Sequence, residues 1–350
     1  MYNDYIIFNR GGKGSMIKRM PLYCDAFACL ASACRDSCCI GWEIDIDEKT
    51  AAFYDTVGGA FGEKLHNHIT DGEVRSICLC GERCPFLNEK GLCDIILTLG
   101  EEHISEICTE HPRYYAWFRG VKEGGIGLSC EEAARLILTA DDPLSFTETR
   151  ICDEGAEDYD EELFSILYAV REELFAILTD KEKPFGERMC AVLSRTFAIQ
   201  MQIGMAEEAD EARPFGDMLS VLSELEVMDP SWLPKIHALR EEVPVLSSGI
   251  TKYLENLAIY FIYRYVLLAS FDGDLLSRVK LCAVSVLVIA ALWQKCIKEK
   301  GYLSEADAAW EAKCYSKEIE YNEDNLAALF DAFYENGVFG MENLKRFLEE

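Results

Sequence analysis

The distribution of cysteine along the chain is the feature that most restricts how this sequence can fold. Eleven of the sixteen cysteines lie between Cys24 and Cys130, and only five follow in the rest of the 350 residues. Isolated cysteines are usually buried as small apolar residues, whereas a dense group of them is more typical of a metal site or a disulfide framework. We therefore expect the N-terminal part of the chain to be organised around its thiols.

The start of the chain bears on whether these thiols are reduced. The sequence MYNDYIIFNRGGKGSMIKRM has neither the apolar segment nor the small-residue cleavage site of a secretory signal. We therefore expect a cytoplasmic protein, in which reducing conditions favour metal ligation over disulfides. An exported, disulfide-bonded protein stays open as an alternative. The apolar stretch from Leu281 to Trp293 is shorter than the roughly 20 residues that cross a bilayer, so it predicts a core helix and no membrane partner.

Charge and composition restrict the partners further. The chain has 62 acidic and 34 basic residues, which give a formal net charge of -28. Such a surface repels nucleic-acid phosphates, so we expect no nucleic-acid partner. It suits a basic protein segment, although a high charge also serves solubility alone. Half of the residues are hydrophobic, which is enough for a sizeable core and excludes a disordered chain.

The N-terminal part shows short, irregular signals. Trp42, Ile44 and Ile46 alternate with acidic residues, which predicts a short strand. Asp47 is placed to cap a helix through Tyr54, and the glycines at 58, 59 and 62 are expected to end it. The apolar spacing in residues 92–103 predicts another helix, and the glycines between 120 and 127 predict a hairpin or loop.

The C-terminal part has helical periodicity almost throughout. Apolar residues recur every three to four positions in residues 163–178, 186–206, 215–226, 232–241, 248–271, 274–299, 303–318, 323–335 and 340–349. Strands and helices do not alternate, so a Rossmann-type sheet is not expected. We predict a mainly α protein with a flexible N-terminal extension (1–20), an irregular cysteine-rich metal-binding domain with short strands (21–145) and a multi-helix C-terminal domain (146–350).

The cysteine spacings predict thiolate ligation of a metal. The chain contains Cys29-x4-Cys34-x3-Cys38-Cys39 and then Cys78-x-Cys80-x3-Cys84-x8-Cys93, with Cys108 and Cys130 further on. Thiolates are soft ligands that suit zinc or iron–sulfur clusters, and four of them commonly converge on one centre. The spacings match neither paired CxxC knuckles nor CxxxCxxC, so residue spacing alone leaves iron and zinc both open.

The motifs also carry a resemblance. Phe27-x-Cys29-x4-Cys34-Arg-Asp-Ser-Cys38-Cys39-x-Gly41-Trp42 resembles the opening of the flagellin lysine-N-methylase family. Cys84-Pro-Phe-Leu87, Gly91-Leu-Cys93, Leu99-Gly100-Glu101, Cys108-x3-Pro112-Arg113 and Leu128-Ser-Cys130-x-Glu132-Ala-Ala-Arg135 continue it in the same order, over residues 21 to about 140. The same cysteine pattern is similar to that of a broader group of small zinc- or iron-chelating proteins.

The resemblance implies a function and a set of ligands. It implies S-adenosylmethionine-dependent N-methylation of lysines on flagellin of the bacterial flagellum, with a cysteine-ligated iron–sulfur cluster of the [4Fe–4S] type. Zinc and a non-catalytic chelating or interaction role are the alternatives. Carried over by position, the metal ligands are Cys29, Cys34, Cys38, Cys39, Cys84, Cys93, Cys108 and Cys130. Eight thiols exceed one cluster, so some are structural or there are two sites; the leading four are Cys34, Cys38, Cys93 and Cys108.

Other polar residues complete the expected site. Arg113 and Glu132 are the predicted cofactor-binding residues, with Arg113 pairing with the carboxylate of S-adenosylmethionine. A structural ion pair accounts for Arg113 equally well, and Glu132 can pair with Arg135 three positions on. His103 and His111 are further candidate metal ligands. The sequence does not select a general base among Glu131, Glu132, Tyr114 and Tyr115.

Overall fold

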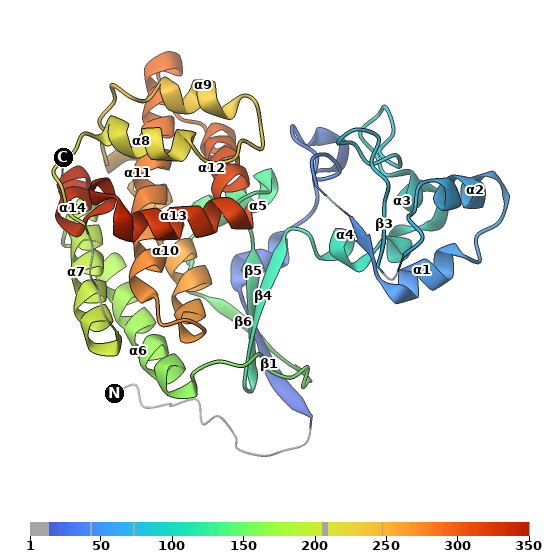
Figure 1. Cartoon of the computed structure of the whole chain (residues 1–350), viewed down its shortest axis with the longest axis horizontal. Coiled ribbons are helices and arrows are strands. Elements are labelled where there is room, and N and C mark those ends of the chain that lie inside the picture. The colour runs from blue at the N-terminus through green and yellow to red at the C-terminus, as the bar shows by residue number, and fades with distance from the viewer. Residues whose placement is uncertain (1–13, 43, 73, 205–208, 247, 350) are drawn as a thin grey trace. The chain divides into compact units, whose positions relative to one another are not determined.

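The computed structural model describes residues 14–349 except 43, 73, 205–208 and 247 (Figure 1). Contacts between Cα atoms divide the chain into two compact units. Unit 2 comprises Ala28–Tyr114 and Cys130–Glu132, and unit 1 comprises the rest. The predicted division into residues 21–145 and 146–350 stays a prediction about independent folding, because the two compact units have different boundaries.

Unit 1 contains a four-stranded sheet in the order β4-β5-β1-β6. Its strands are β1 (Ser15–Pro21), β4 (Arg113–Phe118), β5 (Val121–Ile126) and β6 (Phe146–Cys152). Strand β1 pairs in parallel with β5, with Ile17 opposite Val121, and antiparallel with β6, with Ile17 opposite Arg150. The predicted hairpin or loop is confirmed at Gly120, between β4 and β5, where the φ of +79° favours glycine. Gly124 and Gly125, which were predicted to belong to it, lie inside β5.

Strand β1 corrects one expectation. Residues 15–20 were assigned to the flexible N-terminal extension, but they lie in the centre of the sheet, with Met16 only 1% exposed. The strand has a mixed pattern of basic and apolar residues that gives little periodicity, and it is fixed by pairing with two strands more than 100 residues further along the chain. The rest of the predicted extension, residues 1–13, lies outside the described residues.

The helices of unit 1 confirm the predicted helical periodicity. They are α5 (Glu131–Thr139), α6 (Glu161–Leu178), α7 (Phe185–Ile203), α8 (Phe215–Ser223), α9 (Trp232–His237), α10 (Thr251–Tyr265), α11 (Leu275–Lys300), α12 (Glu305–Ile319), α13 (Glu323–Glu335) and α14 (Met341–Glu349). Short 3-10 helices cover Leu22–Ala26, Ser248–Ile250, Val266–Ser270 and Gly337–Phe339. Asp160, Asp274 and Ser304 cap α6, α11 and α12 by accepting a hydrogen bond from a backbone N–H group.

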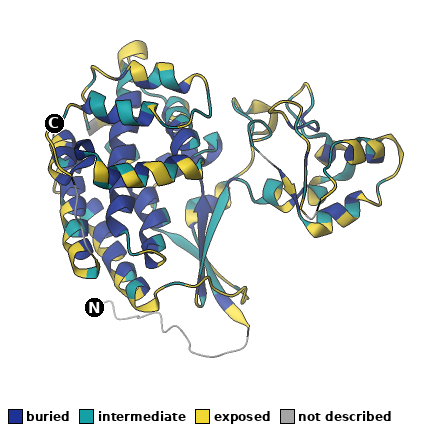
Figure 2. Cartoon of the chain, in the orientation of Figure 1, coloured by how far each residue is buried: buried dark blue, intermediate teal, exposed yellow. Residues whose placement is uncertain are grey.

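Helix α11 forms the centre of unit 1. It contacts α7, α10, α12 and α13, and its residues from Leu275 to Trp293 are all buried (Figure 2). By length and hydropathy it is the one helix, among the described residues, that is able to cross a membrane, yet that whole apolar window is buried inside the protein. The prediction of a buried core helix is therefore confirmed. It ends at Gly301, whose φ of +83° forms a left-handed C-cap.

The sheet and helices of unit 1 share a buried ion pair. The Arg171 guanidinium on α6 donates two hydrogen bonds to the carboxylate of Glu123 on β5, at 2.6 and 2.8 Å. Arg171 is fully buried, and Arg19 lies 3.7 Å from the same carboxylate. The negative charge of Glu123 and its hydrogen bonds hold the pKa of Arg171 above its usual value, against the opposing effect of burial. This pairing fixes the sheet against α6.

Unit 2 contains short elements joined by long turns. They are α1 (Glu48–Tyr54), α2 (Gly59–Asn67), α3 (Asp94–Leu99), α4 (Glu106–Glu110), 3-10 turns at Ala31–Ala33 and Glu101–His103, and a two-stranded ladder of β2 (Asp45–Ile46) and β3 (Arg75–Ser76). The predicted cap of α1 is confirmed, because Asp47 Oδ1 accepts a 2.9 Å hydrogen bond from the Thr50 N–H. The predicted helix over 92–103 is shorter, since Gly100, with a φ of +106°, separates α3 from the following turn.

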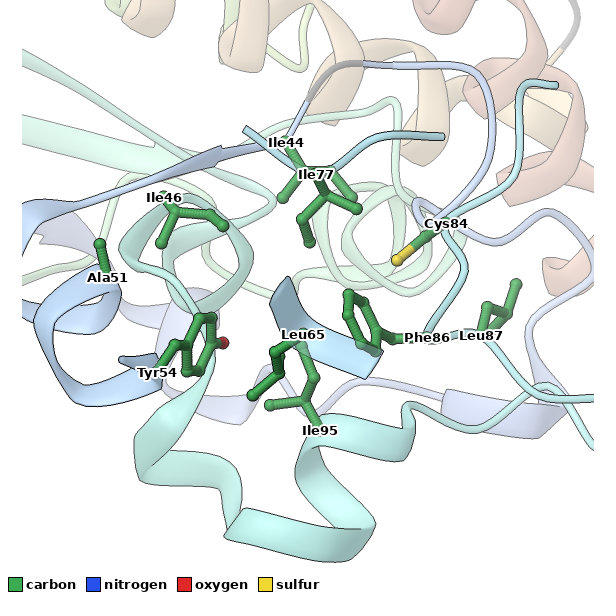
Figure 3. Packing of buried hydrophobic residues seen from close by; sticks show 10 residues of the cluster. All are labelled: Ile44, Ile46, Ala51, Tyr54, Leu65, Ile77, Cys84, Phe86, Leu87 and Ile95. Carbon is green, nitrogen blue, oxygen red and sulfur yellow. The ribbon is translucent and has the colours of Figure 1, made fainter. Parts of the chain in front are cut away.

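The glycines after α1 have a role other than the expected one. They were predicted to end a helix, but Gly59 and Gly62 lie inside α2. A Cβ atom on Gly62 would lie 2.0 Å from the Val57 carbonyl oxygen, so this glycine allows the chain to turn tightly into α2. Behind α2 lies a small core of ten buried residues: Ile44, Ile46, Ala51, Tyr54, Leu65, Ile77, Cys84, Phe86, Leu87 and Ile95 (Figure 3).

Candidate metal centre

The first two cysteines of the candidate centre are brought together by backbone pairing. Ile40 and Arg83 form an isolated antiparallel bridge, flanked by a 2.9 Å hydrogen bond from the Cys84 N–H to the Cys39 carbonyl. The bridge therefore places Cys39 opposite Cys84. Cys84 opens a turn through Pro85, closed by a 3.1 Å hydrogen bond from the Leu87 N–H to the Cys84 carbonyl. Proline favours this turn position because its φ is already fixed.

A second isolated bridge attaches Cys93 to the turn that begins at Cys84. Leu87 and Cys93 pair antiparallel, and the Asp94 N–H donates to the Phe86 carbonyl at 2.7 Å. Cys93 is also the N-cap residue of α3, so its thiol lies beside the unpaired N–H groups of Ile95 and Ile96. These N–H groups favour a thiolate and oppose the rise in the Cys93 pKa that burial causes.

Cys108 lies on the short helix α4, and two hydrogen bonds attach the residues just before Cys108 to α1 and its cap. The Glu106 N–H donates to Asp47 Oδ2 at 2.9 Å, and the Tyr54 hydroxyl donates to the His103 carbonyl at 2.7 Å. These contacts tie α4 to α1, whose cap is the same Asp47. Cys39, Cys93 and Cys108 all pack against the ten-residue core, of which Cys84 is a member.

The four sulfur atoms are close enough to influence one another electrically. Burial is the largest cause that raises the pKa values of Cys84, Cys93 and Cys108, and the negative charge of Cys39 raises all three further. The pKa of Cys84 reaches about 12 and that of Cys108 about 11. Because four ionised thiols would repel one another here, a cation is what would allow all of them to lose their protons.

Cys38 lies next to this group of four and interacts with it directly. Its thiol donates a hydrogen bond to Cys39, which raises the pKa of Cys38 and lowers that of Cys39. The Ser37 hydroxyl and the charge of Arg83 also lower the pKa of Cys39. Cys39 is therefore the cysteine of this group that most readily becomes a thiolate. The Trp42 indole N–H donates to the Cys38 carbonyl and fixes the turn that carries both residues.

The remaining predicted ligands form a looser, exposed set. Cys29 is exposed and Cys34 and Cys130 are half-buried. Negative charges on Glu131 and Cys29 add to the effect of burial in raising the pKa of Cys34. The structure thus groups Cys93 and Cys108 with Cys39 and Cys84, whereas Cys34 lies with Cys29. Three cysteines lie outside the family pattern: Cys24 is buried in unit 1, and Cys78 and Cys80 are exposed.

The predicted cofactor residues lie elsewhere in unit 2. Arg113 is half-buried at the start of β4 and donates to the Thr109 carbonyl at 3.3 Å. Glu132 is buried, at 9% exposure, in the first turn of α5. His111 packs against Trp42, and burial lowers its pKa to about 4, so it is neutral at physiological pH. His103 stacks on Phe53 with the ring centroids 3.9 Å apart.

The donor set of Cys39, Cys84, Cys93 and Cys108 fits a thiolate-bound metal in its chemistry. All four donors are sulfur, and they lie in or against one apolar core, which is the environment of cysteine-ligated zinc and iron–sulfur centres. Within the ranges that the structure describes, however, no group of three or more His, Cys, Asp or Glu side chains is placed so that it could hold a metal ion.

Comparison with known proteins gives two matches of different kinds. The family model of the FliB lysine N-methylase C-terminal domain matches residues 248–347, which include α10 to α13. The lysine-N-methylases of Salmonella typhimurium and Salmonella choleraesuis are each 31% identical over 140 residues, which is 37% of this chain and 35% of theirs. The resemblance to the flagellin lysine-N-methylase family is confirmed.

A third relative extends the likeness to this family. The flagellar biosynthetic protein FliU of Salmonella muenchen is 29% identical over 139 residues, which is 37% of this chain and 82% of FliU. The match thus spans about a third of the length of the two lysine-N-methylases. No solved structure is significantly similar to the chain.

Part of this likeness was not predicted from the motifs. The motifs that carry the resemblance lie in residues 21 to about 140, whereas the family model matches the C-terminal helices. Helical periodicity is shared by unrelated proteins, so it carries no family signal that spacing alone reveals.

Proposed function

We propose that the chain is an S-adenosylmethionine-dependent protein-lysine N-methyltransferase that acts on flagellin and holds a cysteine-ligated iron–sulfur cluster. The observation that carries the proposal is that Cys39, Cys84, Cys93 and Cys108 lie in or against one small core, in a chain similar to lysine-N-methylases. Neither the cysteine cluster nor the likeness to lysine-N-methylases suffices alone. A cluster of thiols also suits zinc storage, and a protein family also includes inactive members.

The four converging cysteines would be the cluster ligands. They replace the leading four of the sequence analysis because Cys34 lies with the exposed Cys29. If three of these four cysteines ligate a [4Fe–4S] cluster, its fourth iron has no protein ligand and would supply a place to bind and orient the methyl donor. Cys93 at the start of α3 and Cys84 in its proline turn are held by backbone hydrogen bonds, so the protein fixes these two sulfurs before any metal arrives.

Arg113 and Glu132 remain the proposed residues for S-adenosylmethionine. A half-buried guanidinium can pair with the carboxylate of the methyl donor, and a buried carboxylate can accept from its amino group. Glu131, one of the candidate bases, forms an ion pair with Arg35, whose Nη2 atom lies 2.6 Å from Glu131 Oε1, so its carboxylate is already engaged. Glu132, Tyr114 and Tyr115 therefore remain the candidates that remove a proton from the lysine.

The substrate proposal rests on charge and on the names of the relatives. Methyl transfer requires the neutral lysine amine, whose usual pKa is about 10.4, so the site must lower that value or supply a base. The net charge of -28 would attract a lysine-bearing surface from solution. One relative is named as a flagellar biosynthetic protein, which favours flagellin as the protein concerned.

A methylation assay tests the proposal. The protein, purified without oxygen and with its metal intact, is incubated with S-adenosylmethionine and the flagellin of the same organism. Methyl increments on flagellin lysines, detected by mass spectrometry and absent without S-adenosylmethionine, are expected. An intact cluster with no increment contradicts the enzyme. Stoichiometric zinc without S-adenosylmethionine binding supports the chelating alternative.

A further inference from the structure

We propose that unit 1 contains a binding site for a primary amine, in which Glu320 accepts a hydrogen bond from the amino group of the substrate lysine. The inference rests on the proposed function and deepens it, because it names a site that receives the lysine. It also adds Glu320 to the residues that are candidates to take a proton from that lysine.

The site is built around a buried carboxylate whose two oxygens have very different surroundings. Glu320 directly follows α12, and its side chain is only 1% exposed. Its Oε2 atom accepts from the hydroxyls of Tyr260 and Tyr265 at 3.0 and 2.9 Å and lies 3.1 Å from Arg264 Nη1. Its Oε1 atom accepts no hydrogen bond from any residue that the structure describes. Because an unsatisfied buried acceptor is costly, Oε1 is suited to a donor that arrives with a ligand.

A second buried polar atom lies on the same side of α12. Ser316 is fully buried, and its Oγ atom likewise has no hydrogen-bond partner among the described residues. The Ser316 carbonyl accepts the Glu320 N–H at 2.9 Å, and side chains four residues apart project from one face of a helix. A carboxylate oxygen only accepts, and a hydroxyl oxygen also accepts, so a small ligand with two or more N–H donors satisfies both atoms.

The groups around Glu320 suit the form of lysine that the reaction needs. Burial raises the pKa values of Tyr260 and Tyr265, so both hydroxyls stay protonated and donate to Oε2. The Arg264 guanidinium also donates to the Tyr260 hydroxyl, and its positive charge balances that of Glu320. A nearby positive charge and burial both lower the pKa of a lysine. The site therefore favours the neutral amine, which is the form that accepts a methyl group.

The position of this cluster in the chain agrees with a role in methyl transfer. Its four members lie within residues 248–347, which match the lysine N-methylase C-terminal domain. The Tyr260 hydroxyl also accepts the Leu128 N–H at 3.3 Å. Leu128 begins the segment that continues to Glu132, one of the two residues proposed for S-adenosylmethionine. The cluster thus holds the backbone that leads to the proposed cofactor residue.

The cluster also lies near the surface of unit 1. The Arg264 side chain is 19% exposed, and Tyr321, next to Glu320, is 36% exposed. A lysine carries its amine on a flexible four-carbon stem, which suits an acceptor just below a surface. In the transfer, the nitrogen lone pair bonds the methyl group as the methyl–sulfur bond breaks, and the sulfonium becomes a neutral thioether. The product ammonium then gives its extra proton to Glu320 and from there to solvent.

Binding of n-butylamine to the full chain tests the site without a methyl donor, so the result is independent of methyltransferase activity. Glu320→Gln should bind this amine at least about tenfold more weakly than wild type by NMR titration, because an amide accepts less strongly than a carboxylate. The matched control is Glu318→Gln, which should bind as wild type does. Glu318 is as deeply buried, but its two oxygens accept the N–H groups of Met228 and Asp229 at 2.8 Å. Equal affinity in wild type and folded Glu320→Gln overturns the proposal.

Two further measurements keep the proposal testable if Glu320→Gln is poorly folded or if the protein has another activity. A crystal of the wild-type chain soaked in n-butylamine should show the nitrogen within hydrogen-bonding distance of Glu320 Oε1, and an ordered water there with no amine contradicts the site. In the methylation assay, Glu320→Gln should lower kcat at least about tenfold and leave the KM for S-adenosylmethionine unchanged. Wild-type kinetics in this variant would overturn the amine site and leave the proposed function intact.

Discussion

The two units of this protein are built in opposite ways. In unit 1, α11 alone buries the whole stretch from Leu275 to Trp293, and α6, α7, α10 and α12 pack around it or around one another. In unit 2 the core has ten residues, and α1 and α2 are exposed over much of their surface (Figure 2). Unit 1 can be stabilised by apolar burial, whereas a core as small as that of unit 2 usually needs crosslinks or metal.

The difference between the two units also bears on where a reactive site can lie. A close-packed helical unit resists small changes in shape, and its buried polar groups, such as Arg171 and Glu123, are already paired with one another. The thiols of unit 2 lie on turns and helix starts, and among the described residues none of them is joined in a disulfide. Under the proposed function the metal chemistry would lie in unit 2, whereas the matched domain of the lysine N-methylase family lies in unit 1.

Removal of metal should produce the largest difference in stability between the two units. Treatment with a strong chelator under reducing conditions should unfold unit 2, because metal binding and folding are coupled in small cysteine-rich modules. Unit 1 should keep its helical circular dichroism and its cooperative thermal transition. Limited proteolysis followed by mass spectrometry is the measurement, with new cleavage expected within residues 28–114 only. Protection of that range without metal would mean that the ten-residue core suffices.

Loss of one ligand should be the next largest effect. Cys84→Ser should lower iron content and flagellin methylation by at least about 100-fold, since even residues that only support metal ligands change affinity or activity 10–100-fold when replaced. Cys80→Ser is the matched control, because Cys80 is exposed four residues earlier. Iron analysis and the methylation assay are made on both variants. Similar losses in the two would show that the buried group of four has no special role.

A substitution in the core of unit 1 tests whether the stability of that unit is independent of metal binding in unit 2. Leu287→Ala, at a fully buried position of α11, should lower the free energy of unfolding of unit 1 by about 2–5 kcal/mol. Metal content should stay unchanged, because this leucine lies in the other unit from the thiols. Denaturant unfolding and elemental analysis give the two readouts. Metal loss in a folded Leu287→Ala variant would contradict the separation of roles.

The smallest expected effect concerns Asp47, which caps α1 and also accepts from Glu106 beside Cys108. Asp47→Ala should destabilise unit 2 by about 1–2 kcal/mol. Burial opposes ionisation of Asp47, but the N–H groups of Glu106 and Thr50 outweigh it and lower its pKa below 3.8.

The pH dependence of this effect follows from the lowered pKa. A carboxyl with a depressed pKa stabilises the fold above its unfolded pKa, and that stabilisation is lost as the pH falls below it. The difference between wild type and Asp47→Ala should therefore be constant above about pH 5 and shrink below pH 3.8. Thermal unfolding of the metal-loaded proteins measures it, and a difference that grows on acidification would contradict the capping role.

Local features of the fold were predictable from the sequence. Periodicity found the long helices of unit 1, and the position of Asp47 predicted the cap of α1, because both depend on residues a few positions apart. The central place of β1 was not predictable, since its partners β5 and β6 lie more than 100 residues away. The same holds for the candidate centre. The family resemblance included its cysteines among eight predicted ligands, but the leading four contained only Cys93 and Cys108 of the group. The pairing of Cys39 with Cys84 depends on a bridge between Ile40 and Arg83 that no local pattern predicts.

The most direct test of the account is the metal content and visible spectrum of the full chain purified without oxygen. We expect iron with acid-labile sulfide, a broad visible absorption that reduction bleaches, and loss of both in Cys84→Ser but not in Cys80→Ser. A colourless protein without iron, whose cysteines are joined in disulfides, would contradict the central claim that these thiols form a metal centre.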